Sequence, residues 1–469
     1  MKKAIKSQVK INRDYLFLLG VGLGYFVALL DLTMINVALP DMNIDIGLSS
    51  TQLSLVTNIY TWAMIISLPI GGRLGDKLGK RRIFIASMIA IGFFGGMGGI
   101  TLHFNVILFS RFAIGFFAGL MIPQTLTLIK SVFAQERQGW ALGIWGAIGG
   151  IASIVGPALG GVLVSFIGWK AIFYINTPIA LIAIIVAYYW IPKDVICKNI
   201  SIDIKGIFLL CMTCTLFGTG LILLISHIYD FGEIFIIIGF VSFLLLICYE
   251  RSQNQAIAVI PTDLWKNVSF INFCILGALA SACTFIITFV ISIYAQNIIG
   301  TDPFVAGMLV VPASVVSVIT SPKAGKLLDA NKGFHCVFLG LIAFLISFTL
   351  LLFAFSNLSI IIVFIASAIF GLGNGLLMPS LTSLALGNVK LSSVSAASSL
   401  VVITRQLGVL IGGITSVGVL LLEHVTIQTI KSHELLNVVW FSLIFIVLGF
   451  ILLLMARTKK KKIIIGNID

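Results

Sequence analysis

Long apolar runs recur along the whole chain, and short segments rich in charge, proline or glycine separate them. A helix needs roughly 20 mostly apolar residues to cross the hydrocarbon core of a bilayer, and most of these runs approach or exceed that length. The pattern therefore predicts an all-α integral membrane protein with fourteen transmembrane helices. We expect the spans at residues 15–39, 53–70, 83–101, 105–129, 140–165, 170–191, 205–226, 232–249, 269–297, 304–321, 335–355, 358–384, 397–421 and 437–456.

One acidic residue interrupts this pattern. Asp31 lies well inside the first apolar run, whereas the other acids fall at segment ends, in loops or in the tails. Because a charged side chain near the centre of a membrane span costs about 3 kcal/mol or more, such a residue is a candidate functional site. Asp31 is therefore the first candidate for handling protons or cations.

Composition agrees with a membrane protein. The chain has 59% hydrophobic and 10% charged residues, with a mean hydropathy of +1.14. Soluble domains carry roughly 25% charged residues, and no polar stretch here is long enough for a separate folded domain. The first apolar run is too long for a cleaved signal and contains an acid, so we expect a retained helix.

The positive charge reports orientation in the membrane. The net charge is +13, and if both termini are cytoplasmic, nearly all of the 30 Lys and Arg fall in cytoplasmic segments or tails. Of the loop residues, only Lys170 and Lys431 fall on the other side. Basic residues favour the cytoplasmic side, so we predict a multi-pass protein of the cell membrane with both termini inside. The charge does not indicate a nucleic-acid partner.

The chain also repeats itself. Gly115-x-x-x-Gly119-x-x-x-Pro123 recurs as Gly371-x-x-x-Gly375-x-x-x-Pro379, and Gly72-Arg73-Leu74-Gly75-Asp76 recurs as Gly325-Lys326-Leu327-Leu328-Asp329 at nearly the same separation. Parallel repeats of this kind place a substrate site between two halves near the membrane midplane. We predict a cytoplasmic tail (1–14), a six-helix bundle (15–191), an inserted helix pair (192–268), a second six-helix bundle (269–456) and a basic cytoplasmic tail (457–469).

These features resemble the major facilitator superfamily, and within it the fourteen-helix branch of drug:proton antiporters. The loop 72–82, with Gly72, Asp76, Gly79, Lys80 and Arg81, is similar to the hallmark G-x-L-A-D-R-x-G-R-K loop, with Gly75 in place of Ala. The stretch 30–40 resembles the first-helix motif of that branch, and 169–178 the start of its sixth helix. The resemblance implies the major facilitator fold, two six-helix bundles plus an inserted pair, working by alternating access.

Two further motifs are similar to the family pattern but depart from it. The stretch with Gly156, Pro157, Gly160 and Gly161 resembles the antiporter signature of the fifth helix, although Ala152 stands where the pattern has Gly. Glycines allow close helix approach and Pro157 permits a bend. The stretch is therefore a pivot or a leak-tight seam in one half, or it provides tight packing alone. The fourth-helix motif is looser, with Ile114 and Phe117 replacing the usual residues.

The loop residues and the buried charges suggest roles, each with a plainer alternative. Asp76 would cap or pair with a neighbouring helix end and hold the cytoplasmic side shut, or the loop is only a basic orienting segment. Asp31 lies about 12 Å from the outer end of its span and Arg111 about 9 Å from the outer end of its own, at 1.5 Å per residue. We expect the two to be linked in proton coupling, the alternative being a static ion pair.

Other polar residues inside spans are candidates for a substrate cavity. Arg405 would contact an anionic group of the substrate, line a wet cytoplasmic cavity, or bond to carbonyls at a helix end. Single polar residues can equally bond between helices. The remaining cavity candidates are Asn36, Tyr60, Gln124, Trp145 and Gln296.

Neither a metal site nor a catalytic centre is predicted. Cys211-x-x-Cys214 has the spacing of a redox or zinc pair, but no second pair or His lies nearby in its apolar run, so we expect packing residues. The sequence contains no His-Glu-x-x-His, no G-x-S-x-G and no phosphate-binding loop. This argues against a membrane-embedded enzyme and an ATP-driven pump, and a receptor or channel would not require the duplicated halves.

We therefore expect a secondary transporter and not an enzyme. Its predicted function is proton-coupled export of amphipathic drugs, dyes or antiseptics across the cytoplasmic membrane, and the runner-up is export of an endogenous lipid-like or metabolite substrate. Nutrient uptake is third. We expect no cofactor, with the proton gradient as the energy source, and a monomer whose partners are a small amphipathic substrate, protons and the lipid bilayer.

Overall fold

The computed structural model describes residues 2–48, 50–194, 203–226, 232–252, 261–301, 303–387, 389–390, 393–422 and 432–465. Every regular element in these ranges is a helix, so the predicted all-α class is confirmed. Thirteen of the described helical segments are long and apolar enough to cross a membrane. The remaining predicted span, 205–226, coincides with a helix at Ile204–Ser226, some of whose side chains lie outside the described part of the chain.

The helices follow the predicted spans but extend beyond most of them. The first group is α1 (Lys2–Ile46), α2 (Ser50–Leu78), α3 (Lys80–Ile100), α4 (Phe104–Val132), α5 (Gln135–Ile167), α6 (Ala171–Tyr174) and α7 (Asn176–Trp190). The inserted segment holds α8 (Ile204–Ser226), α9 (Gly232–Ser252) and α10 (Thr262–Lys266). The second group is α11 (Val268–Ile293), the π-helix η1 (Tyr294–Ile298), α12 (Pro303–Asp329), α13 (Gly333–Ser356), α14 (Ile360–Gly387), α15 (Val394–Leu422) and α16 (Ser432–Ile465).

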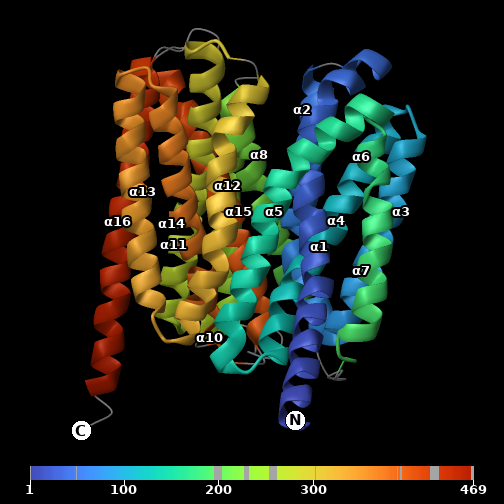
Figure 1. Cartoon of the computed structure of the whole chain (residues 1–469), viewed down its shortest axis with the longest axis vertical. Coiled ribbons are helices and arrows are strands. Elements are labelled where there is room, and N and C mark those ends of the chain that lie inside the picture. The colour runs from blue at the N-terminus through green and yellow to red at the C-terminus, as the bar shows by residue number, and fades with distance from the viewer. Residues whose placement is uncertain are drawn as a thin grey trace.

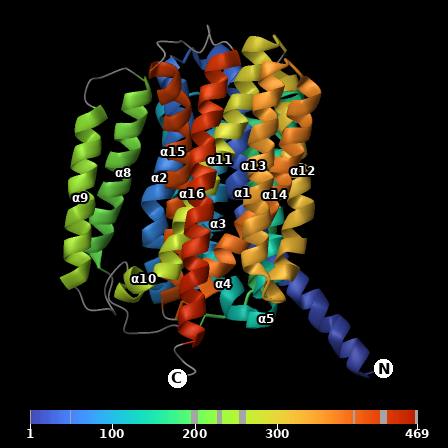
Figure 2. The same cartoon turned by 90° about the vertical axis from the view of Figure 1, so that its left-hand side faces the viewer.

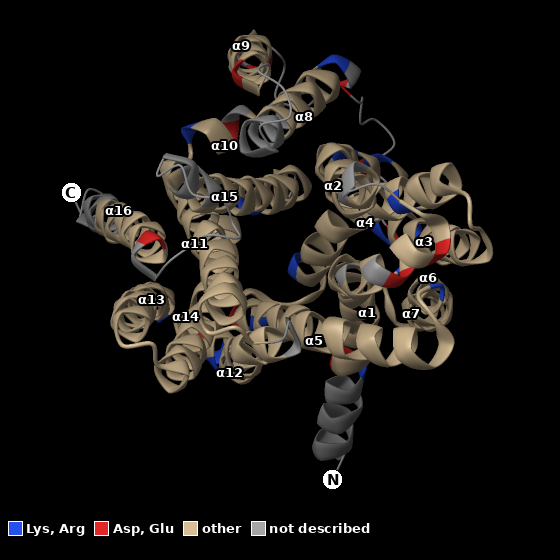
Figure 3. Ribbon diagram, turned by 90° about the horizontal axis from the view of Figure 1, so that it is seen from above, with Lys and Arg blue, Asp and Glu red and all other residues tan. Residues whose placement is uncertain are grey.

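The helices run side by side along the long axis of the molecule, and both termini lie at one end, here called the terminal end (Figure 1). Viewed along that axis, α1–α7 form one group and α11–α16 another, and α8 and α9 stand at their side (Figure 3). The groups meet where α5 packs against α12 and α2 against α15, and α8 contacts both α2 and α15. Figure 2 shows α9 as the outermost helix of the inserted pair.

The repeated glycines place the helices of each group at close distance. A Cβ atom added at Gly115 of α4 would collide with the backbone of Tyr60 in α2, and one added at Gly371 of α14 would collide with the backbone of Ala313 in α12. The same helix pair is therefore packed in the same way in both groups, backbone against backbone. Small residues at such contacts are the usual device for helix association in membranes.

One predicted boundary is wrong. The stretch 72–82 is not a loop, because α2 continues through Leu78 and α3 begins at Lys80. Only Gly79 separates the two helices, and its φ of 104° is a conformation that side chains other than glycine rarely adopt. A single residue thus reverses the chain direction, and Asp76 lies in the last turn of α2 and not in a loop.

The close approach of α4 to α2 is testable by substitution. Replacing Gly115 by Leu should destabilise the protein by about 1–3 kcal/mol because the added atoms overpack a backbone contact. Gly371→Leu should have a similar effect at the equivalent place, whereas Gly161→Ala, whose Cβ would meet nothing within 4 Å, should be neutral. Thermal unfolding of the purified full-length protein measures all three. Equal melting temperatures would contradict this account of the repeats.

Candidate transport site

The buried acid and the buried arginine form an ion pair. Nη1 of Arg111 in α4 donates to Oδ2 of Asp31 in α1, and the two side chains are 0% and 1% exposed. Leu30, Met34 and Ile35 of α1 pack around this position in an apolar cluster with Trp169 and Phe173. The structure therefore brings together the two residues that were expected to lie at similar depth.

Three other groups surround the pair, and no motif in the sequence links them to it. Asn176, the first residue of α7, donates its amide to Oδ1 of Asp31 at 2.6 Å. Nε of Arg111 donates to the Val56 carbonyl of α2 at 3.2 Å, and its guanidinium carbon lies 4.8 Å from the centre of the Tyr60 ring. The pair thus joins α1, α2, α4 and α7 through hydrogen bonds and one cation–π contact.

The network is not saturated. Nη2 of Arg111 and Oδ1 of Asn176 are buried and have no hydrogen-bond partner. Because nearly all buried polar atoms in native structures are satisfied, orphaned atoms in one small cluster require an explanation.

Two motifs of the sequence meet beside this pair. Thr33 hydrogen-bonds back to the carbonyls of Leu29 and Leu30, and its Oγ1 fills the space that a Cβ on Gly156 of α5 would need. Gly160 faces Met34 one turn further along. Pro157 is exposed and Gly161 has open space around it, so within this motif it is Gly156 and Gly160 that contact α1 closely.

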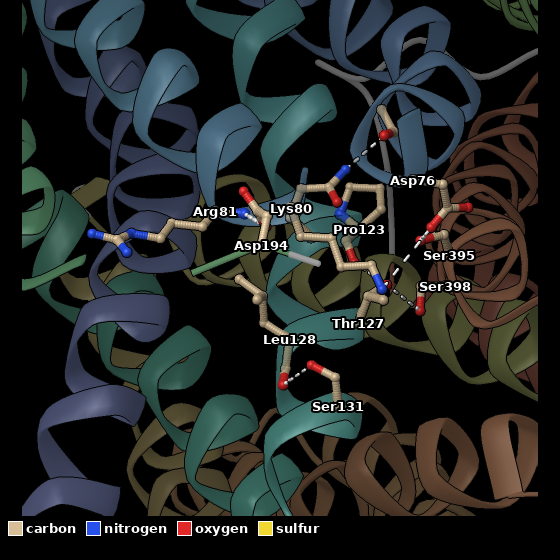
Figure 4. Close-up of polar contacts among 12 residues, drawn as sticks. Asp76, Lys80, Arg81, Pro123, Thr127, Leu128, Ser131, Asp194, Ser395 and Ser398 are labelled. Carbon is tan, nitrogen blue, oxygen red and sulfur yellow. Dashed lines mark hydrogen bonds and ion pairs between the residues drawn. The ribbon is translucent and has the colours of Figure 1, made fainter. Parts of the chain in front are cut away.

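At the terminal end, an acid of each group accepts hydrogen bonds from a helix of the other group. Asp76, in the last turn of α2, accepts a hydrogen bond of 2.6 Å from Ser395 at the start of α15 (Figure 4). Gly72 lies one turn earlier, where a Cβ would collide with Ser399 of α15. Lys80 lies 4.0 Å from the Asp76 carboxylate on its own side.

The second group repeats this contact with its own acid. Asp329, the counterpart of Asp76 and the last residue of α12, accepts hydrogen bonds from the backbone N–H of Gly139 and of Trp140 in α5, at 2.8 and 2.9 Å. The acceptor is a carboxylate, and hydrogen bonds that involve an ionised group are stronger than those between neutral groups. We call the Asp76 and Asp329 contacts the terminal latch.

The neighbouring basic residues do not all join the latch. The backbone N–H of Arg81 donates to Asp194 at 2.9 Å, and its guanidinium donates to the Tyr188 carbonyl at the end of α7. Figure 4 shows its side chain extending away from Asp76 and Ser395. Gly79 fits beside the same Asp194 carboxylate, which a Cβ would strike. Gly79 and Arg81 therefore fasten α3 to the end of α7 within one group.

The predicted cavity residues do not form one cluster. Tyr60 is fully buried under Arg111 and donates to the Ala28 carbonyl at 2.8 Å, and Gln124 is buried and donates to the Gly71 carbonyl at 2.6 Å. Trp145 donates to Thr125, and Gln296 donates to Ser292 within its own group. The side chain of Asn36 lies outside the described residues.

Two of these positions explain details of the sequence. Gln124 occupies the space where a Cβ on Gly75 would stand, which accounts for glycine at that position of the loop motif. Arg405 of α15 donates to the Met378 carbonyl and to Thr382 in α14. Three roles were predicted for Arg405, and the structure shows one of them, a hydrogen bond to a backbone carbonyl. That carbonyl belongs to Met378 of the neighbouring helix α14.

The buried pair is testable through stability. Replacing Asp31 by Ala leaves Arg111 charged and unpaired, so the free energy of unfolding should fall by about 3–5 kcal/mol. Asn176→Ala removes a single hydrogen bond to a charged group and should lower it by only about 1.5–3 kcal/mol. Thermal or denaturant unfolding of the purified variants compares them. The double variant Asp31→Asn with Arg111→Gln should recover part of the loss, and no recovery would argue against a direct pair.

Comparisons with known proteins bear on this architecture. The model of the Major Facilitator Superfamily matches residues 21–413. The multidrug transporter protein MdtP of Bacillus subtilis (strain 168) is 28% identical over 389 residues, covering 81% of this chain and 70% of that protein. The methylenomycin A resistance protein of the same organism is 27% identical over 84% of this chain and 85% of its own.

Two further similar proteins are transporters of other kinds of substrate. The riboflavin transporter RibZ of Clostridioides difficile (strain 630) is 26% identical, covering 78% of this chain and 79% of that protein. The crystal structure of the human organic anion transporter MFSD10 (TETRAN) matches with a TM-score of 0.67 at 13% identity, covering 94% of this chain and 99% of that one. The likeness to that structure concerns the fold alone.

Proposed function

This chain belongs to the major facilitator superfamily and is a multi-pass membrane transporter, and we propose that it exports amphipathic drugs, dyes or antiseptics in exchange for protons. The buried Asp31–Arg111 pair carries the proposal. A carboxylate inside a membrane span is a typical proton carrier in transporters. The similarity to a multidrug transporter and a resistance protein supports the class of cargo.

The pair would couple the two fluxes through charge. While Asp31 is ionised, its bonds to Arg111 and Asn176 hold α1, α4 and α7 together. Protonation removes the negative charge, leaves Arg111 without its counter-ion in a low-dielectric setting, and so favours a different helix arrangement. Release of the proton on the other side restores the pair and the first arrangement.

The proposal requires a second state. Asp31 is 1% exposed and Arg111 is 0% exposed in this conformation, so neither reaches water here. Another conformation of the cycle must open a path from one side of the membrane to the carboxylate. The orphaned atoms of Arg111 and Asn176 are consistent with partners that change between the two states.

Proton coupling is tested by transport in proteoliposomes. With the wild type, an imposed pH gradient should drive movement of a fluorescent dye against its own gradient, and dye movement should in turn release protons. Asp31→Asn keeps the size of the side chain but cannot ionise, so we expect gradient-driven movement to fall to the rate of protein-free vesicles. Asn176→Ala is the matched control, because it keeps the carboxylate. Full gradient-driven transport by Asp31→Asn would refute the proposal.

The terminal latch would hold this conformation shut at the end where both termini lie. Lys and Arg favour the cytoplasmic side, so we assign that end to the cytoplasm. The two acids Asp76 and Asp329 each accept hydrogen bonds from a helix of the opposite group. Opening the terminal end requires breaking both contacts, which makes them a gate in the sense of alternating access.

Labelling of introduced cysteines tests this gate. In a variant without the native cysteines, Cys at position 398 should react slowly with a maleimide, because Ser398 is fully buried between α15 and α4, 3.4 Å from Thr127. Adding Asp76→Ala and Asp329→Ala should raise that rate several-fold, since the closed state loses two charged contacts. Cys at position 131, where Ser131 is exposed, should react equally in both backgrounds. An unchanged rate at position 398 would contradict a gating role.

A second cargo is favoured by one comparison. The riboflavin transporter RibZ covers this chain about as fully as the resistance proteins do. A metabolite is therefore the alternative substrate, moved by the same buried pair and the same gate. Testing riboflavin and lipids beside the dyes distinguishes the two kinds of substrate. A metabolite exporter should transport riboflavin or a lipid and should not transport the dyes.

A further inference from the structure

Arg405 holds a position unlike that of the other described arginines. It lies near the middle of α15, and its guanidinium donates to the Met378 carbonyl at 2.8 Å and to the Thr382 hydroxyl, both in α14. Its Nε is buried and has no hydrogen-bond partner. The side chain as a whole is nevertheless partly exposed, and Gly277 of α11 leaves space beside it, because the Arg405 Cγ and Nε would lie 3.8 Å from an added Cβ.

The charge of Arg405 has no acidic counterpart among the described residues. Arg111 is paired with Asp31, and Arg73 interacts electrostatically with Asp76, Glu250 and Asp203. For Arg405 the interacting groups are the phenol of Tyr25 and the thiol of Cys274, which are uncharged in their usual forms near neutral pH. A cation in mid-membrane without a counter-ion is unfavourable, and charges at that depth usually serve substrate or ion pathways.

An aromatic pair from the opposite group lies beside this charge. Tyr25 of α1 stacks on Trp145 of α5, with ring centres 3.9 Å apart and planes 14° from parallel. The Tyr25 ring packs against Gly149 of α5, where a Cβ atom would collide with the ring. Trp145 is held in turn by a 3.1 Å hydrogen bond from its indole to Thr125. Tyr25 itself is partly exposed, as Arg405 is.

The arrangement therefore places a guanidinium of one group within electrostatic range of a stacked aromatic pair of the other. Substrate sites in proteins built from parallel repeats lie between the halves near the midplane, and this is such a place. A guanidinium can donate two parallel hydrogen bonds to the two oxygen atoms of a carboxylate. The Nε of Arg405, which has no partner, is one of the donors that such a bidentate contact uses. An aromatic body would stack on Tyr25 while its carboxylate supplies the absent counter-ion.

We propose that Arg405, with the Tyr25–Trp145 pair, forms a substrate subsite for the carboxylate of an aromatic amphipathic compound. The proposal rests on the exporter function above and narrows its cargo to molecules that carry an oxyanion on a flat ring system. The competing account is structural: Arg405 fastens α15 to α14 through Met378 and Thr382 and meets no substrate.

Two dyes that differ at one group test the subsite. Rhodamine 110 carries a free carboxylate, and rhodamine 123 is its methyl ester. Their binding to the purified full-length protein is measured by fluorescence polarisation without any proton gradient, so the result does not depend on proton coupling. We expect the wild type to bind the acid at least tenfold more tightly than the ester, and Arg405→Gln to lose this preference.

Further variants separate recognition from structure. Arg405→Lys should keep part of the preference, because it keeps the charge but loses the fork. Thr382→Val removes an acceptor without touching the charge and should keep the preference within about threefold. Arg405→Gln should unfold at an equal or higher temperature than the wild type, since it removes a charge without a counter-ion from a membrane span.

Several outcomes would overturn the subsite. The wild type could bind the acid and the ester equally, or fail to bind the acid. Arg405→Gln could keep the preference for the acid. The melting temperature of that variant could also fall markedly, which would show that Arg405 has a structural role. Any of these would leave the proton-exchange proposal standing, because that proposal is decided by Asp31→Asn and gradient-driven transport.

Discussion

The structure depends on one constraint: a charge inside the membrane has to be neutralised by a neighbour, because water is not there to do it. Asp31 and Arg111 satisfy that constraint for each other, and the pair then determines much of its surroundings. Tyr60 covers the guanidinium, Val56 accepts its Nε–H, and Asn176 fixes the second carboxylate oxygen. Helices α1, α2, α4 and α7 are joined at one point by this ion pair and its hydrogen bonds.

The glycines bear on the proposed function because they bring helices together through their backbones. Backbone contact at Gly115, Gly371, Gly72 and Gly325 lets whole helices meet without interlocking side chains. Helices that meet through their backbones can move past one another with few changes of side-chain rotamer. The free-energy difference between conformations would then depend mainly on a few polar contacts. The terminal latch provides two of these at one end, and the buried pair lies toward the other end of α1.

Much of the fold was readable from the sequence because its causes are local or periodic. Apolar run length predicted the spans, and repeated glycine spacing predicted which helices of the two halves are equivalent. The link between Asp31 and Arg111 followed from depth alone, since two unpaired charges at one height in a membrane have a strong reason to meet.

The sequence did not predict which side of each helix faces a given neighbour, or which distant segments come into contact. Asn176 appeared only as part of a motif, with nothing to indicate that it faces Asp31. The hydrogen bonds from Gly139 and Trp140 to Asp329 are invisible in a pattern because backbone N–H groups carry no sequence signal. The continuation of α2 through Leu78 was missed for the opposite reason: charged residues read as a loop, although they lie at the edge of a membrane helix where charge is tolerated.

The two halves share a scaffold but not its chemistry. Arg111 lies four residues before Gly115, and the position four residues before the equivalent Gly371 is Ser367, which is also buried but carries no charge. Tyr60, under the first glycine, corresponds to Ala313 under the second. The buried ion pair thus lies in the first half, while Arg405, which has no acidic partner among the described residues, belongs to the second. On the proposed function this division has a physical consequence. A proton changes the packing inside one half, an anionic substrate neutralises the other, and the two events communicate only through the surface along which the halves move.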